Sequence, residues 1–306
     1  MNKGYIKIAL ALLSVAGYMQ NIAFAIEHAA ATTSSNEKFE QLSLRVKQAK
    51  EAQQAKEAQQ AKEAEEAKEA AYVMDEALNI AKKHAEDLDG YELYYEKNRG
   101  TRLYFKKVNN TDVGRLDLII PKPNSYDAVV DILWDPNGEK KFDASFIEGL
   151  TSKIYGLDFI IRQNRYKSAI QSWKTYYHAL AKKVELSEDQ TAIVFVSSNM
   201  NDHDGGNNSE YVNPIVESAN TFKPDIDSQR DIRNGELSKV YVNISAFFIY
   251  NDCCCTRITH IISMDHNTLP DTTDETLRVM TAQKMLNVAN LRNVLTRNMP
   301  TRYAVL

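Results

Sequence analysis

Cysteine is scarce in this 306-residue chain and is confined to the run Cys253-Cys254-Cys255. A secreted disulfide scaffold carries an even number of well-spaced cysteines, and adjacent cysteines cannot join distant parts of a chain. Zinc binding would need a fourth ligand and a different spacing, because consecutive side chains point apart. We interpret the triplet as a cysteine-rich turn, with acylation or a redox role as the alternatives.

An excess of positive charge is also missing. The chain has 37 Lys and Arg residues against 41 Asp and Glu residues, for a formal net charge of −4. Nucleic-acid-binding proteins typically show clusters of excess Lys and Arg. The composition therefore indicates that nucleic acid is not a partner.

Catalytic motifs are absent as well. The sequence contains no G-x-S-x-G, H-E-x-x-H, P-loop or G-x-G-x-x-G pattern. The run "SSNMNDHDGGNNSEY" does gather the polar side chains Asn199, Asp202 and His203. We interpret this run as a polar loop, and we expect no enzymatic activity.

The same polar run does not fit a metal site. A calcium-binding loop needs an acidic residue at its first position and a Glu six residues after its glycine. With Gly205 as that glycine, Met200 and Tyr211 occupy those two positions. No second histidine lies four residues from His203, as a zinc-binding helix would place it. We expect no metal and no cofactor.

The first 25 residues have the pattern of a secretory signal peptide. Lys3 and Lys7 accompany the mostly apolar run Ile8–Met19, and Ala23-Phe24-Ala25 supplies a cleavage site of small residues. The apolar run is shorter than the ~20 residues of a membrane-spanning helix. Cleavage removes two lysines and no acidic residue, so the secreted chain would carry a net charge of −6.

A hexapeptide repeat follows, reading AKEAQQ-AKEAQQ-AKEAEE-AKEA over residues 49–70. Its residues are strong helix formers, and they offer charged pairs at helical spacing. No Leu or Ile lies between Gln48 and Tyr72 to form a buried seam. We interpret residues 26–71 as a low-complexity helical spacer, with a protein partner bound through residues 38–71 as the alternative.

A folded domain is expected from residue 72 to residue 306. Its sequence predicts a helix from Val73 to His84 and then three strands in an antiparallel meander, because turn-forming residues separate the runs. These strands are Tyr91–Lys97, Thr101–Val108 and Val113–Ile120. A short helix is expected over Ser125–Trp134.

The second half of this domain adds more strands and a closing helix. Ile154–Arg162 and Trp173–Leu186 are aromatic-rich and ambiguous between strand and helix, whereas Thr191–Ser198, Lys239–Tyr250 and Thr256–Met264 are predicted strands. In Lys239–Tyr250, alternation places Val242, Ile244 and Phe248 on one face and Tyr241, Asn243 and Phe247 on the other. Asp274–Leu295 has an apolar stripe that includes Lys284, whose ammonium we expect to reach solvent. The order of elements predicts an α+β fold in which a C-terminal helix covers a curved antiparallel sheet.

Five segments carry a resemblance to a known family. They are GYELYYEKNRGTRLYFKKVNNTDVGRLDLIIPKPNSYDAVVDILWDPNGEKKFD, LDFIIRQNRYKS, HALAKKVELSEDQTAIVFVSSNMNDHDG, NPIVESANTF and KVYVNISAFFI. In this order they resemble the fam-a proteins of malaria parasites (Plasmodium), which carry a START-related lipid-transfer domain. The resemblance runs from about Tyr72 to the C-terminus, with Trp134-Asp135-Pro136 and Ser197–Gly205 as its most specific parts. It leaves the repeat unexplained.

The resemblance implies a START-like helix-grip fold, in which a curved sheet holds a long C-terminal helix with a lipid cavity between them. It implies binding and transfer of a phospholipid, phosphatidylcholine in particular, with transient contact to a membrane surface. Aromatic faces bind quaternary ammonium groups and Arg binds phosphate. The candidates for the head group are accordingly Trp134, Arg162, Arg165, Trp173, Tyr176, Tyr177, Tyr241 and Asn243. Met280, Met285 and Leu291 are candidates for the tunnel or lid, while Asn199, Asp202 and His203 would form a loop near the cavity.

Three functions are open at this point, and the weakest is a hydrolase built on the same cavity, because no catalytic motif is found. The first is a secreted phospholipid carrier that moves one lipid at a time between membranes. The second is an exported interaction protein or antigen that keeps the fold without transferring lipid. The resemblance implies export to the host red cell or the surrounding vacuole, although no export pentapeptide of the R-x-L-x-E/Q/D type follows Ala25.

Overall fold

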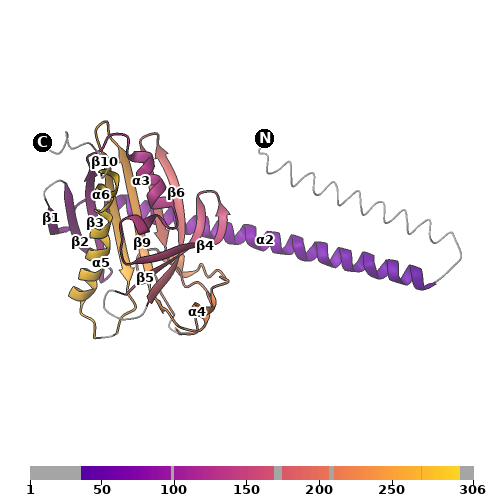
Figure 1. Ribbon diagram of the computed structural model, residues 1–306. Coiled ribbons are helices and arrows are strands. Elements are labelled where there is room, and N and C mark those ends of the chain that lie inside the picture. The colour runs from indigo at the N-terminus through magenta and orange to yellow at the C-terminus, as the bar shows by residue number, and fades with distance from the viewer. Residues whose placement is uncertain (1–35, 98–99, 169–173, 207–209, 270, 297–306) are drawn as a thin grey trace. The chain divides into compact units, whose positions relative to one another are not determined.

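The structure is a computed structural model that describes residues 36–97, 100–168, 174–206, 210–269 and 271–296 (Figure 1). The chain divides into two compact units, Met1–Glu65 and Glu66–Leu306. The predicted signal peptide and Trp173 lie outside the described residues. Among the residues described, no helix is long and apolar enough to span a membrane.

The repeat is helical, as predicted. Helix α2 runs from Asn36 to Glu86. In the first unit its side chains from residue 43 onward are almost all exposed, and glutamines pair with glutamates one turn later, as in Gln53 to Glu57 (3.0 Å). Such pairs stabilise a solvated helix.

The second unit is built on one large sheet. Within the described residues the sheet has ten strands, and neighbours along its main path run β1-β2-β3-β10-β9-β7-β6-β5-β4. These pairs are antiparallel, while the short β8 pairs with β6 in parallel. The strands are β1 (Glu92–Lys97), β2 (Thr101–Val108), β3 (Thr111–Ile120), β4 (Phe146–Gly156), β5 (Phe159–Lys167), β6 (Lys174–Ser187), β7 (Gln190–Val196), β8 (Ser238–Lys239), β9 (Tyr241–Asn251) and β10 (Thr256–Asp265).

The predicted meander of β1, β2 and β3 is confirmed, and so is the pairing of β9 with β10 across the cysteine-rich turn. The ambiguous middle segments are strands. The run Ile154–Arg162 contains a turn at Leu157-Asp158, so it contributes to both β4 and β5. The sequence had not separated these two strands because its apolar residues continue through the turn.

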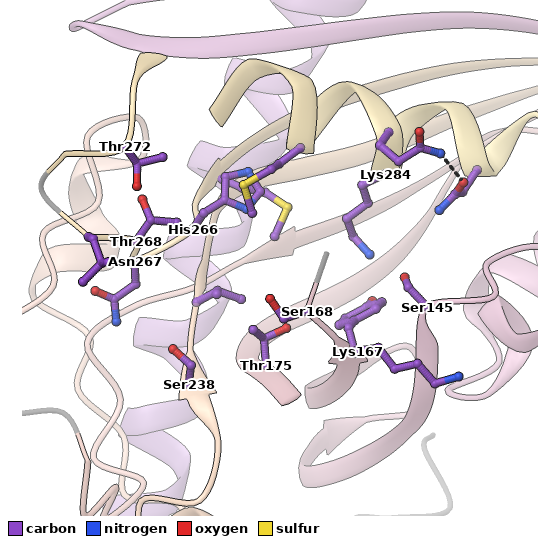
Figure 2. A pocket seen from close by; sticks show the side chains of 17 residues that line it. Ser145, Lys167, Ser168, Thr175, Ser238, His266, Asn267, Thr268, Thr272 and Lys284 are labelled. Carbon is purple, nitrogen blue, oxygen red and sulfur yellow. Dashed lines mark hydrogen bonds between the residues drawn. The ribbon is translucent and has the colours of Figure 1, made fainter. Parts of the chain in front are cut away.

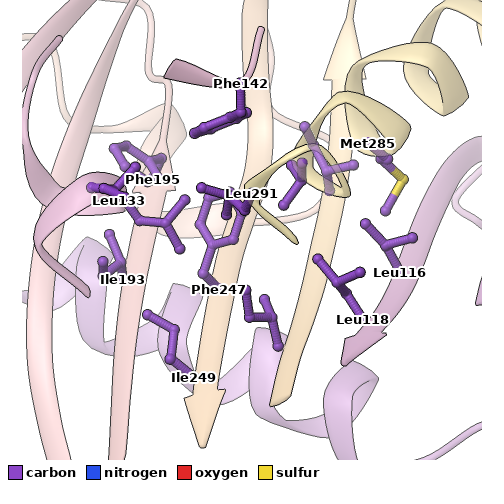
Figure 3. Packing of buried hydrophobic residues seen from close by; sticks show 14 of the residues in the cluster. Leu116, Leu118, Leu133, Phe142, Ile193, Phe195, Phe247, Ile249, Met285 and Leu291 are labelled. Carbon is purple, nitrogen blue, oxygen red and sulfur yellow. The ribbon is translucent and has the colours of Figure 1, made fainter. Parts of the chain in front are cut away.

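Helices cover both faces of the sheet (Figure 1). On one face lie α3 (Tyr126–Trp134), α5 (Asp274–Val288) and α6 (Leu291–Thr296), above a core that includes Leu116, Phe195 and Phe247. Figure 3 shows Met285 and Leu291 of the C-terminal helices packed over this core. We call this side of the sheet the inner face.

The opposite side, the outer face, is covered by the second part of α2. Val73, Met74 and Ala77 are buried there against a second core that contains Ile161, Val194 and Phe248. At the end of α2, Arg115 Nη1 donates to the carbonyl oxygens of His84 (3.2 Å) and Asp87 (3.4 Å). A guanidinium at this position offsets the partial negative charge of a helix C-terminus.

The closing helix is interrupted. The sequence predicts one helix over Asp274–Leu295, whereas the structure has α5 and α6 separated by Ala289-Asn290. Asn290 Nδ2 donates to the carbonyl oxygen of Phe142 (3.0 Å). Asparagine is a weak helix former, and this bond ties the interruption to the segment after α3.

A bulge in β9 corrects the predicted alternation of its side chains. The pairing with β10 shifts between Ile244 and Val242, which leaves Asn243 as the extra residue. Val242 therefore packs in the inner core together with Phe247, while Ile244 packs in the outer core. An extra residue reverses the faces of all side chains beyond it.

Candidate functional site

Polar side chains interrupt the apolar inner face at strand β5. Alternation along β5 turns Arg162, Asn164 and Tyr166 toward the inner face, and Gln163 and Arg165 toward the outer face. Tyr177 of the neighbouring strand β6 lies beside Tyr166, with ring centroids 6.0 Å apart. These residues form the polar part of an otherwise apolar interior.

A cavity of about 260 Å³ opens between α5 and this part of the sheet. Figure 2 shows Lys284 reaching down from α5 toward it, with Ser145, Thr175 and Ser238 on the facing wall. Tyr166, Val240, Met264, His266 and Met280 also contribute to its wall. Most of the lining residues are polar, and the apolar side chains among them include Val240, Met264 and Met280.

A second and much smaller cavity, of about 30 Å³, lies further inside. This is about the volume of one water molecule. Lys284 lines both cavities, and the inner one is also bordered by Glu139, Asp143 and His260. The Lys284 side chain therefore stands between the two spaces.

The ammonium group of Lys284 is held by an aromatic ring and two carboxylates. Its Nζ lies 3.6 Å from the ring centroid of Tyr166, 3.5 Å from Glu139 Oε2 and 4.0 Å from Asp143 Oδ2. The sequence had predicted that this lysine reaches solvent, but its side chain is only 21% exposed. The reason is that the acidic residues after α3 offer it a partner inside.

Hydrogen bonds fix the groups around this ammonium. Tyr166 donates its hydroxyl to Glu139 Oε2 (2.8 Å), and Asn164 Nδ2 donates to Glu139 Oε1 (3.1 Å) and to the Tyr177 hydroxyl (3.0 Å). Burial raises the pKa of both tyrosines, so their hydroxyls stay neutral. Asp143 accepts from the backbone amide (2.8 Å) and hydroxyl (2.6 Å) of Ser145.

His260, which is buried, and His266, which is partly exposed, lie on the same side of the sheet. Burial, with a smaller contribution from the charge of Lys284, lowers the pKa of His260 to about 3 and that of His266 to about 4. His260 stacks on Phe247 with ring centroids 3.9 Å apart, and its Nδ1 has no hydrogen-bond partner among the described residues. Both rings are therefore neutral near pH 7.

Arg162 and Trp134 form a separate cluster at the end of α3. Arg162 donates to the last carbonyl oxygens of that helix, those of Leu133 and Trp134. Its guanidinium carbon lies 5.2 Å from the ring centroids of Trp134 and Phe195, and burial lowers its pKa. Its Nε has no partner in the described part of the chain, so one donor stays available on the inner face.

The other predicted head-group residues lie away from the cavity. Arg165 forms a two-bond ion pair with Asp231 on the outer side (2.6 and 3.0 Å). Tyr176 packs there against a loop, Tyr241 stacks on Tyr211 at 3.9 Å, and Asn243 accepts from the Tyr211 hydroxyl (2.7 Å). Thus the structure brings Trp134, Arg162 and Tyr177 together on the inner face and places these four elsewhere.

The predicted loop near the cavity contains a buried ion pair. Asp202 accepts from Lys239 Nζ (2.7 Å) and pairs with His178 Nδ1 (3.0 Å). Burial alone would raise the pKa of Asp202, but its bonds to His178 and Lys239 lower it below the usual value. His203 is partly exposed and pairs with Asp225 (3.2 Å), and Asn199 is partly buried.

This loop belongs to a network on the outer side of the sheet. With the Gln163 amide oriented so that its nitrogen donates to His178 Nε2 (3.0 Å), its oxygen accepts from Arg165 Nε (2.7 Å). The chain of bonds thereby runs from Asp202 through His178 to Arg165. These bonds tie the loop to β5 and β6.

The three predicted tunnel or lid residues take two positions. Met280 lines the larger cavity, whereas Met285 and Leu291 are fully buried in the inner core. Among the described residues, no group of three or more His, Cys, Asp and Glu side chains could hold a metal ion. The arrangement can hold a cationic group and an apolar tail.

The sequence reasoning missed Glu139, Asp143, Tyr166 and His260. Asn164 and Tyr166 could have been found from the alternation of β5 once Arg162 was chosen as inward-facing. Glu139 and Asp143 lie in and after a short 3₁₀ helix, Gly138–Lys141, and no periodicity of the sequence points to them.

Comparison with solved structures agrees with the architecture. Human StAR-related lipid transfer protein 5 superposes with a TM-score of 0.55 at 11% sequence identity, covering 74% of this chain and 98% of that one. The chain has a START-like helix-grip fold. Its curved sheet and C-terminal helix correspond to the predicted fold class, which is confirmed.

Other solved structures align less closely. The lipid transfer and protein localization domain of human StarD13 (DLC2) has a TM-score of 0.48 at 14% identity, covering 71% of this chain and 94% of that one. A STAR-related lipid transfer protein from Xanthomonas axonopodis has a TM-score of 0.44 at 12% identity, covering 68% and 98%. No family profile matches the sequence, and no curated protein matches it.

Proposed function

We propose that this protein binds one phospholipid, phosphatidylcholine in particular, inside the helix grip and carries it between membranes. The observation that carries the proposal is the ammonium-holding site of Glu139, Asp143 and Tyr166 at the end of an apolar interior. A lipid head group with an ammonium has the charge for this site, and its chains suit the interior.

The energetics favour an enclosed ligand. Exposing a methylene group to water costs ~0.8 kcal/mol, so two acyl chains of about thirty methylenes resist leaving a membrane by on the order of 20 kcal/mol. A carrier must replace the membrane with a dry interior of similar area. The inner core beneath α5 provides apolar side chains for this purpose.

The closed structure has too little space for such a ligand. Its larger cavity, about 260 Å³, is below the ~300–1,000 Å³ of pockets that enclose drug-sized ligands, and a phospholipid is larger still. Loading therefore requires α5 to move away from the sheet. The first half of α5 is mostly exposed, and its buried residues begin at Thr281, so opening must extend past Thr281 to reach the inner core.

A disulfide between helix and sheet tests this proposal. A Cβ atom added at Gly114 of β3 would lie 2.5 Å from Met285 Sδ of α5, so Gly114→Cys and Met285→Cys place two thiols at the contact between sheet and helix. The variant is made with Ser at positions 253–255 to remove the native thiols. Transfer of fluorescent phosphatidylcholine between vesicles should stop in the oxidised protein and return on reduction.

The parent with Ser at positions 253–255, oxidised and reduced in parallel, is the control. Full transfer by the oxidised double-cysteine protein, with the disulfide verified by mass, would contradict opening at α5. Absence of transfer from the parent would contradict the carrier proposal itself.

We also propose that the protein is a secreted fam-a-like protein of the malaria parasite, exported to the host red cell or the vacuole. The supports are the signal-peptide pattern of residues 1–25 and the segments that resemble the family. Sequencing the N-terminus of the mature protein tests secretion: the expected first residue is Ile26, and an intact Met1 would contradict it.

One observation favours the alternative, an exported interaction protein without transfer activity. The interior of the closed structure is almost filled by the protein's own side chains. The transfer assay decides between the two, because an interaction protein of this kind neither extracts nor delivers lipid.

A further inference from the structure

We propose that Lys284 is a built-in competitor for the ammonium group of the ligand and thereby determines which lipids the protein accepts. This inference rests on the proposed function and deepens it. In the closed structure the Lys284 ammonium occupies the cation site, so a lipid with an ammonium can bind only by displacing it.

The contacts of Lys284 are those that a ligand ammonium would make. Its Nζ lies over the Tyr166 ring at 3.6 Å and faces Glu139 (3.5 Å) and Asp143 (4.0 Å). An aromatic face and carboxylates are the groups that bind an ammonium best in a desolvated site. The side chain of Asp143 is only 2% exposed, so the site needs a cation to compensate a buried charge.

The position of the side chain explains how exchange can occur. Lys284 borders both the cavity of about 260 Å³ and the inner one of about 30 Å³. If its stem turns toward the larger cavity, the two spaces join and the carboxylates become accessible. Because Lys284 belongs to α5, the same movement releases one of the contacts that hold this helix on the sheet.

Neighbouring groups keep the site selective for a cation that arrives with the ligand. His260 and His266 face Lys284 from β10 and the segment after it, and both are neutral near pH 7. Lipids without an ammonium gain nothing from the vacated carboxylates. Displacement of Lys284 is therefore favourable only for lipids that bring their own ammonium.

Two substitutions separate this role from a merely structural one. Lys284→Met removes the competitor and keeps an apolar stem, so binding of phosphatidylcholine should become about tenfold tighter. Glu139→Gln weakens the site for Lys284 and for the ligand alike, so on its own it should change binding of phosphatidylcholine little, whereas added to Lys284→Met it should make binding about tenfold weaker. Both changes loosen α5, and amide hydrogen exchange of α5 in the lipid-free protein should rise in both.

Lys107→Met is the matched control, because Lys107 forms an exposed ion pair with Asp274 of α5 outside the cavity. It should leave phosphatidylcholine binding unchanged. Phosphatidylglycerol with the same acyl chains is the lipid control, and its binding should change less than twofold in Lys284→Met. Weaker binding of phosphatidylcholine by Lys284→Met, or an equal gain for phosphatidylglycerol, overturns the inference.

A soluble probe tests the inference separately from lipid carriage. Choline chloride should reduce hydrogen exchange of α5 in lipid-free Lys284→Met and have no such effect in the wild type or in Glu139→Gln. If no variant binds any lipid, the proposed function fails, while the choline result still decides whether the site exchanges Lys284 for another ammonium. If Lys284→Met does not fold, Lys284→Gln takes its place: tighter binding of phosphatidylcholine supports the inference, and unchanged or weaker binding overturns it.

Discussion

We predict that the protein loses stability in mild acid because of His260 and His266, the two histidines on the inner side of the sheet. Folding holds the pKa of His260 at about 3 and that of His266 at about 4, whereas the ordinary value is 6.5. The unfolded chain therefore takes up protons that the folded chain does not. The stability that these neutral rings confer is complete above pH 6.5 and is lost as the pH falls below it.

The size of the loss follows from these values. Consider a histidine that has the ordinary pKa of 6.5 in the unfolded chain and stays neutral in the folded state. Between pH 7 and pH 5 it lowers the free energy of unfolding by about 2 kcal/mol. His260 is fully buried and contributes all of this, while His266 is partly exposed and contributes somewhat less. The free energy of unfolding should thus fall by about 3–4 kcal/mol from these two residues.

Urea unfolding at pH 7 and at pH 5 measures this loss. His260→Gln should reduce the difference between the two pH values by about 2 kcal/mol, whatever its effect at pH 7, and His266→Gln should reduce it by slightly less. Leu44→Ala, an exposed change that involves no titratable group, is the control and should leave the difference unaltered. If neither inner-face substitution reduces the difference, water reaches these histidines in solution, and the dry interior beneath α5 is refuted.

Two further predictions concern the outer side of the sheet. Lys239→Met should lower the free energy of unfolding by about 3–5 kcal/mol, because it leaves the carboxylate of Asp202 buried without its cation. In urea denaturation, adding Asp202→Asn to Lys239→Met should restore a large part of the lost free energy of unfolding. Additive losses from the two substitutions would contradict the pairing. Met74→Ala should lower the free energy of unfolding by about 2–5 kcal/mol, because Met74 is fully buried between α2 and the sheet. Thermal unfolding measures this loss, with the exposed Leu44→Ala as the control. A loss no larger than that of the control would contradict the packing of α2.

Much of the fold could be predicted from the sequence because apolar and polar residues alternate along its strands. β2, β3 and β10 were predicted within a few residues of their bounds, since half-buried strands repeat every two residues and turns carry Asn, Asp and Gly. β4 was not separated from β5 because Ile154 in β4 and Leu157 in the turn after it are both exposed apolar residues. The apolar pattern therefore does not mark the end of the strand. Where such a strand ends is decided by its tertiary contacts.

The site was harder to predict than the fold. Alternation shows that Arg162 and Arg165 lie on opposite faces of β5, but it does not show which face the C-terminal helix covers. Residue type alone made Tyr241 a head-group candidate, and alternation could not correct this choice because the bulge in β9 reverses the faces beyond Asn243. Glu139 and Lys284 are 145 residues apart, and only the fold brings them together.

Native mass spectrometry of the mature protein after incubation with mixed-phospholipid vesicles is the most direct test of lipid carriage. We predict a discrete added mass of one phosphatidylcholine per chain, retained after the vesicles are removed. A protein that returns bare from every vesicle mixture would contradict it, and would leave an interaction protein built on a START-like fold.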